Sequence, residues 1–161
     1  MKPVTRVGWL AYALAIVIIA ADQASKYWIL NVIHLPEMGS MDVFGPLRLS
    51  FVENPGVSFG FFRGEAMARW VFSAFAIIVA VILAVWARRA ERPITGVTLG
   101  LFMGGALGNV IDRIRFGWVA DFIDVQALHF PWVFNIADSA ITIGAVVLLA
   151  EAVLMPKKAA A

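Results

Sequence analysis

The chain lacks cysteine altogether and has only two histidines, His34 and His129, among its 161 residues. Without cysteine there are no disulfide bonds, no thiolate nucleophile and no cysteine-ligated metal. Two isolated histidines exclude a histidine-rich metal site. The HExxH motif of zinc peptidases and the GxSxG motif of serine hydrolases are also missing. A hydrolase with this sequence would need another source of acid–base chemistry.

Charge is scarce as well, and apolar residues take its place. Charged residues make up 15% of the chain and hydrophobic residues 61%, whereas a soluble domain is about 45–50% apolar. The mean hydropathy is +0.85. These values indicate an integral membrane protein, and the length suits one domain over residues 1–161. With a net charge of only +2, we expect no nucleic-acid partner.

Four windows are apolar enough for membrane helices, which need roughly 20 residues each. They cover residues of about 7–30, 66–87, 94–114 and 132–155. We interpret the first window as a retained span, because no small-residue cleavage site follows it at a plausible place. The expected fold is therefore an all-α membrane protein with four transmembrane helices and a small β element.

Lysine and arginine near the span ends predict the orientation. Three basic clusters fall on one side of the membrane: Lys2 with Arg6; Arg88, Arg89 and Arg92; and Lys157 with Lys158. By the positive-inside rule, that side and both termini are cytoplasmic. The segments of about 31–65 and 115–131 then lie on the outer face, which in a bacterium is the periplasmic side of the inner membrane.

The first outer segment has the pattern of a strand and a turn. Leu47 to Phe51, "LRLSF", alternates apolar and polar residues, as a half-buried strand does. The following "ENPGVSFG" predicts a turn, because Pro55 fixes φ and Gly56 can adopt positive φ. We expect a small sheet at the membrane surface.

Polar residues inside the spans are costly and call for an explanation. Asp22 and Lys26 lie one helical turn apart, and they either form a local ion pair or orient loops of a site. Asn109, Asp112 and Arg113 share one face of the third window. They either hold helices together or support a site in which Arg113 donates to a carbonyl or phosphate.

Three glycines in the third window, Gly100, Gly104 and Gly108, recur every fourth residue. Such a stripe of small residues favours close helix packing. A groove for acyl chains is the alternative interpretation.

The last polar group contains the residues best suited to catalysis. Asn135 and Asp138 are expected to share a face at the start of the fourth window, and Asp121 lies in an extended stretch just before it. Asp121 and Asp124 should point to opposite sides of that stretch. The two acids Asp121 and Asp138 are either hydrated separately at the interface or paired. A pair shares a proton, so that one carboxylate can activate water while the other donates to a peptide carbonyl.

These motifs together resemble the lipoprotein signal peptidases, the type II signal peptidases of bacteria. The resemblance covers nearly the whole chain through "ADQASKYWI", "VENPGVSFG", "GGALGNVIDRIRFGWVADFIDV" and "FNIADSAI", in this order. It implies an aspartic endopeptidase of the inner membrane with four helices and a small periplasmic β-cradle. Such enzymes remove signal peptides from diacylglyceryl-modified prolipoproteins by cleaving just before the lipidated cysteine.

Carried over motif by motif, the resemblance assigns the catalytic pair to Asp121 and Asp138. The positions that match residues lining the site or holding substrate are Asn54, Gly56, Asn109, Arg113, Asn135 and Ala137. Supporting positions in the first and third motifs are Asp22, Lys26 and Asp112. The resemblance also implies inhibition by globomycin, contact with membrane lipids and no metal or other cofactor. Nothing in the sequence demands more than a monomer.

Three other interpretations stay open at this point. Intramembrane acids can form a proton relay in a channel or transporter. A metal-dependent hydrolase could use an oxygen-rich site, whose candidate ligands are Asp112, Asp121, Asp124, Asp138 and His129. The glycine stripe could also serve a scaffold without catalytic activity.

Overall fold

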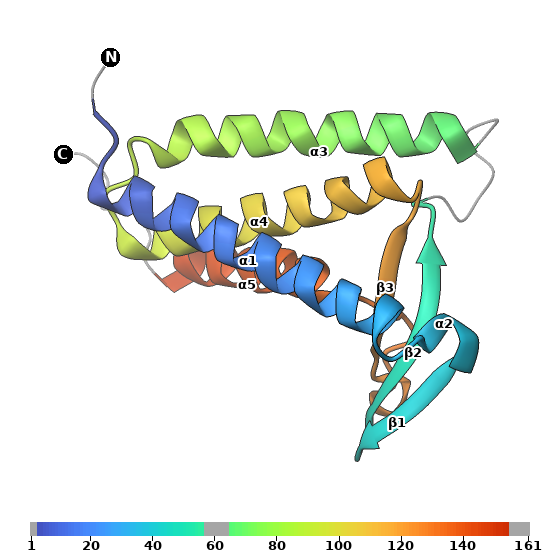
Figure 1. Cartoon of the computed structure of the whole chain (residues 1–161). Coiled ribbons are helices and arrows are strands. Elements are labelled where there is room, and N and C mark those ends of the chain that lie inside the picture. The colour runs from blue at the N-terminus through green and yellow to red at the C-terminus, as the bar shows by residue number, and fades with distance from the viewer. Residues whose placement is uncertain (1–2, 57–64, 155–161) are drawn as a thin grey trace.

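Four long helices run alongside one another in the computed structural model, which describes residues 3–56 and 65–154, and a small sheet stands at one end of them (Figure 1). The long helices are α1 (Arg6–Asn31), α3 (Glu65–Ala87), α4 (Pro93–Arg115) and α5 (Ile136–Leu154). Two short helices, α2 (Leu35–Met38) and η1 (Gln126–Leu128), lie in the connections at the sheet end.

Three of the described helices are long and apolar enough to cross a membrane. They are α1, residues Met67–Ala87 of α3, and α4. By length and apolar composition, these helices match three of the four expected spans and support the membrane interpretation. The fourth expected span corresponds to α5, which has 19 residues and is not among those three helices. Its role as a span remains a prediction.

The fourth helix starts later than the sequence predicts. The expected start near Trp132 is wrong, because the backbone of Phe134 is hydrogen-bonded to Ile123 of the small sheet. Phe134 N–H donates to Ile123 O at 3.0 Å, and Ile123 N–H donates to Phe134 O at 2.7 Å. Asn135 therefore precedes α5 and caps it, with its Oδ1 accepting from Asp138 N–H at 2.8 Å. The expectation that Asn135 and Asp138 share a helix face is corrected in the same way.

Helix α4 lies at the centre of the bundle and packs against α1, α3 and α5. Its glycines let the neighbouring backbones approach. A Cβ added at Gly100 would lie 2.8 Å from Ala11 O, and one at Gly104 would lie 2.6 Å from Ile18 Cβ. Gly108 faces Asp22 and Ala137 instead. The prediction of close helix packing is confirmed.

Replacing Gly105 by alanine is expected to destabilise the protein by about 1–3 kcal/mol, because the added methyl would overpack a closed interface. Its Cβ would clash with Ala137 O and lie 2.7 Å from Ile141 Cγ1. Thermal unfolding in detergent measures the effect. Gly144→Ala is the matched control, since its Cβ would meet Leu101 Cβ at an ordinary 3.4 Å. Equal losses in both variants would show that close packing at Gly105 is not the cause.

The sheet has three antiparallel strands in the order β1-β2-β3 among the described residues: β1 (Ser40–Phe44), β2 (Leu47–Asn54) and β3 (Val119–Asp124). The first two strands confirm the predicted small sheet, and its place on the outer face stays a prediction. The third adds the extended stretch that carries Asp121. Just after β2, Gly56 adopts a φ of +86°, as the predicted turn requires. The rest of that turn, residues 57–60, lies outside the described residues.

A small apolar core fixes the sheet to the end of α1. Ile29 of α1, Leu35 of α2, Leu49 of β2 and Phe122 of β3 are buried against one another. Burial of these side chains is the main favourable contribution to the placement of the sheet. Because Phe122 is adjacent to Asp121, this core also holds the backbone of one candidate site residue.

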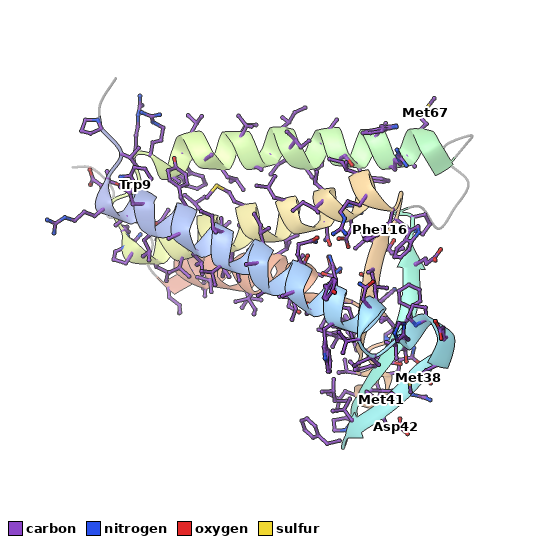
Figure 2. All side chains as sticks on the ribbon, in the orientation of Figure 1. Trp9, Met38, Met41, Asp42, Met67 and Phe116 are labelled. Carbon is purple, nitrogen blue, oxygen red and sulfur yellow. The ribbon has the colours of Figure 1, made fainter. Side chains whose placement is uncertain are left out.

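The start of α1 and the end of α5 both lie at the end of the bundle opposite the sheet (Figure 1). Trp9 marks that end, whereas Phe116 lies beside the sheet (Figure 2). An ion pair of 2.5 Å between Arg92 and Glu151 joins α4 to α5 near the Trp9 end. Because Arg6, Arg88 and Arg89 also lie at this end, at the start of α1 and just after α3, the bundle has a basic end and a sheet end.

Candidate active site

Asp121 and Asp138 line one pocket at the sheet end, beside α5. The pocket has a volume of about 470 Å³. Asp121 projects from β3 and Asp138 from the first turn of α5. The remaining walls are mostly apolar, and the residues that form them include Phe130, Trp132, Val133, Phe134 and Ile143. An apolar pocket with a few convergent polar groups is the usual form of a binding site.

Two asparagine side chains connect the acids. Asn135 Nδ2 donates to Asp121 Oδ1 at 2.7 Å and to Asn109 Oδ1 at 3.1 Å. Asn109 Nδ2 in turn donates to Asp138 Oδ1 at 2.8 Å. The two carboxyl groups therefore belong to one hydrogen-bonded unit, in which each keeps its other oxygen for further contacts.

Asn54 holds the second oxygen of Asp121. Its Nδ2 donates to Asp121 Oδ2 at 2.9 Å, and its Oδ1 accepts from Gly56 N–H at 2.8 Å. The side chain thus closes the turn after β2 and contacts the site at the same time. The resemblance implies both Asn54 and Gly56 as site residues. Asn54 lines the pocket, whereas Gly56 is not among its lining residues and contacts the Asn54 side chain.

Burial raises the pKa of Asp121 to about 6, and the nearby charge of Asp138 adds to the increase. Hydrogen bonds from Asn54 and Asn135 and the charge of Lys26 act in the opposite direction. Desolvation prevails because Asp121 is only 2% exposed. Its carboxyl group can consequently carry a proton at a pH where an ordinary aspartate is ionised.

Asp22, Lys26 and Asp112 form a buried ionic cluster behind the pocket. Lys26 Nζ lies 2.8 Å from Asp22 Oδ2 and 2.7 Å from Asp112 Oδ2. It also donates to Asn109 Oδ1 at 3.2 Å. The sequence leaves Asp22 and Lys26 as either a local ion pair or a support for the site. The cluster contains the ion pair and also contacts Asn109, one of the two asparagines that connect Asp121 and Asp138.

Neither Arg113 nor Ala137 is among the residues that line the pocket of Asp121 and Asp138. Arg113 lines a second, apolar pocket of about 320 Å³ between α3, α4 and α5, together with Asn109 and Phe72. Within the described part of the chain, its buried Nε has no hydrogen-bond partner. Ala137 is fully buried, packs against Gly105 and Gly108, and is not among the residues lining either pocket described here.

Asp124 points away from the site, as the strand pattern predicts. Its carboxylate accepts from Ser50 Oγ at 2.6 Å and from Gln126 N–H at 2.9 Å. The hydrogen bond from Ser50 holds the pKa of Asp124 below its usual value. In residues 3–56 and 65–154, no group of three or more His, Cys, Asp or Glu side chains is placed to hold a metal ion. The four acids and one histidine considered as metal ligands therefore form no such group in the described part of the chain.

One residue of this region escapes the sequence analysis. Gln23 Nε2 donates to Asp112 Oδ1 at 2.8 Å, to Asp22 Oδ2 at 3.2 Å and to Gly108 O at 3.3 Å. The only signal in the sequence is its position directly after Asp22. The spacing of residues along α1 cannot reveal that Gln23 contacts Asp112 on α4.

Fold and site together define a class: a membrane protein with two linked carboxyl groups in a pocket at one end of an apolar helix bundle. The family model described as Signal peptidase (SPase) II matches residues 14–154. The chain belongs to this family and is a bacterial membrane peptidase.

Relatives and solved structures agree with this assignment. A lipoprotein signal peptidase of Caulobacter vibrioides is 48% identical over 94% of this chain and 90% of its own length. Another, from Rhizorhabdus wittichii, is 40% identical over 91% of this chain and 87% of its own. A bacterial membrane enzyme solved by the in meso method at 1.9 Å is similar with a TM-score of 0.78 and 29% identity. That similarity covers 98% of this chain and 99% of the solved one.

Proposed function

We propose that the protein is an aspartic endopeptidase that removes signal peptides from diacylglyceryl-modified prolipoproteins by cleaving just before the lipidated cysteine. The observation that supports this proposal most strongly is the linked pair of Asp121 and Asp138 in one pocket. Family membership supports the substrate class.

The proposed chemistry needs one ionised and one protonated carboxyl group. The ionised aspartate takes a proton from water, and the resulting hydroxide attacks the peptide carbonyl carbon. The protonated aspartate donates to the carbonyl oxygen as it becomes tetrahedral. Collapse of this intermediate breaks the C–N bond, and the leaving amine receives a proton from the pair. The raised pKa of Asp121 favours it as the protonated partner.

The location of the pocket fits a substrate anchored in the membrane. Its acids lie at the sheet end, where α1 ends and α5 begins. Arg6, Arg88, Arg89 and Arg92 lie at the other end, which supports a cytoplasmic assignment for that end and a periplasmic one for the site. A scissile bond beside a lipid-modified cysteine would be presented at this depth. Confinement to the membrane lowers the entropic cost of bringing the bond to the acids.

The purified protein in detergent is expected to cleave a prolipoprotein carrying the diacylglyceryl group and to leave the unmodified precursor intact. Adding a chelator should not change the rate, because the proposed chemistry uses carboxyl groups alone. Globomycin should inhibit cleavage. Gel mobility and mass spectrometry of the products measure the outcome. Cleavage that stops with the chelator would reject the metal-independent mechanism, and equal cleavage of both precursors would reject the lipid requirement.

A further inference from the structure

Each candidate catalytic aspartate follows a residue whose backbone is held by another acid. Ala120 N–H, just before Asp121, donates to Asp112 Oδ2 at 3.1 Å. Ala137 N–H, just before Asp138, donates to Asp22 Oδ1 at 3.0 Å. Asp112 and Asp22 therefore fix the backbone positions from which the two catalytic side chains project.

These two backbone-holding acids are themselves joined by two side chains of α1. Lys26 Nζ contacts Asp22 Oδ2 at 2.8 Å and Asp112 Oδ2 at 2.7 Å. Gln23 Nε2 contacts Asp22 Oδ2 at 3.2 Å and Asp112 Oδ1 at 2.8 Å. Asp112 thus receives one bridging donor on each oxygen. A carboxylate held at both oxygens is constrained in rotation as well as in position.

We propose that Gln23, acting with Lys26, sets the separation of Asp121 and Asp138 by bridging the two acids that hold their backbones. Gln23 is thus a positioning residue of the peptidase site. This role rests on the proposed function, since it assumes that Asp121 and Asp138 react with substrate.

The chemistry of Gln23 suits this role. One lysine faces two carboxylates in this cluster, so a second bridging group has to be a donor that brings no further negative charge. A neutral amide meets that requirement, and it needs little desolvation compared with a second ammonium group. The partly buried amide is also held on its acceptor side, where Gln23 Oε1 accepts from Arg115 Nη1 at 3.4 Å.

Gln23→Leu tests the proposal, because it keeps the side-chain size and removes the donor. We expect kcat on the lipidated precursor to fall ~10-fold or more, since small errors of position are costly in catalysis, with little change in KM. Gln23→Asn retains the amide on a shorter side chain and should lose less. Ser25→Ala is the matched control, because that hydroxyl contacts only the backbone oxygen of Asp22 among the described residues.

The pH dependence of kcat/KM separates positioning from simple stability. The charged groups that act on Asp121 are Asp138 of α5, Lys26 of α1 and Arg113 of α4. If Gln23→Leu lets Asp121 and Asp138 move apart, burial and the charge of Asp138 raise the pKa of Asp121 less. The limb of the profile assigned to Asp121 should then move to lower pH.

Two results would overturn the proposal: an unchanged kcat in Gln23→Leu, or a reduced kcat with an unmoved pH limb and a matching loss of folded protein. Thermal unfolding in detergent gives the folded fraction. The same assay on Asp121→Asn and Asp138→Asn tests the proposed function separately. If those variants stay active, the dyad is wrong whatever Gln23 does. If they are inactive and Gln23→Leu behaves as wild type, only the positioning role fails.

Discussion

Replacing either Asp121 or Asp138 by asparagine is expected to abolish cleavage, with a loss of roughly 10²–10⁴-fold in kcat for each variant. Asparagine keeps the shape of the side chain but cannot exchange a proton with water or with the leaving amine. Both carboxyl oxygens of Asp121 accept from amide groups, those of Asn54 and Asn135, so the NH2 group introduced by Asp121→Asn would face a donor. Thermal unfolding in detergent therefore checks that each variant is folded. Product formation from the lipidated precursor, measured under single-turnover conditions, gives the rate.

Asp124→Asn is the control for this experiment. Asp124 is a buried acid on the same strand, but it bonds Ser50 and Gln126 away from the pocket. The Asp124→Asn variant should therefore retain most of the wild-type rate of cleavage. The double variant with both Asp121 and Asp138 replaced should be no slower than either single variant, because the two acids act as a unit. Near-normal cleavage by either single variant would disprove the dyad.

Lys26→Met is expected to cause the largest loss of stability, about 3–5 kcal/mol, because it leaves two buried carboxylates without their shared cation. The Lys26 side chain is 3% exposed, and those of Asp22 and Asp112 are fully buried. Water cannot replace the lost charge at such a site. Thermal or denaturant unfolding in detergent, followed by tryptophan fluorescence, measures the loss.

A second variant distinguishes unbalanced charge from lost packing. Combining Lys26→Met with Asp112→Asn removes one negative charge, so part of the lost stability should return. If lost packing were the only cause, Asp112→Asn should lower the stability further. If Lys26→Met unfolds as wild type does, the cluster contributes little and the assigned ion pairs are not significant for stability.

Much of the fold could be predicted because it depends on patterns along the chain. Apolar windows of sufficient length gave the bounds of α1, α3 and α4 to within a residue or two. Alternation in Leu47–Phe51 predicted a strand, and Gly56 was expected at positive φ, as observed. These features reflect local requirements: hydrocarbon thickness, strand alternation and backbone sterics.

The rest depends on contacts between distant segments. The start of α5 was misplaced because Phe134 pairs with Ile123, which no periodicity in the fourth window records. Asn135 was expected on the helix, yet it caps the helix and reaches across to β3. Gln23 was missed because its partner Asp112 lies on another helix. Residue type predicted which side chains matter, but the tertiary structure decides what each one holds.

The bond between Asp22 and Ala137 has a consequence for biosynthesis. The two residues are 115 positions apart in the chain. This contact between α1 and α5 can therefore form only after α5 has been synthesised. A nascent chain inserted as far as α4 contains Asp22, Lys26 and Asp112, but it has neither Asp138 nor the backbone that Asp22 holds. Assembly of the pocket is thus a late event, as expected for contacts of long sequence separation. On the proposed function, the peptidase site is complete only when α5 has docked on α1 and α4.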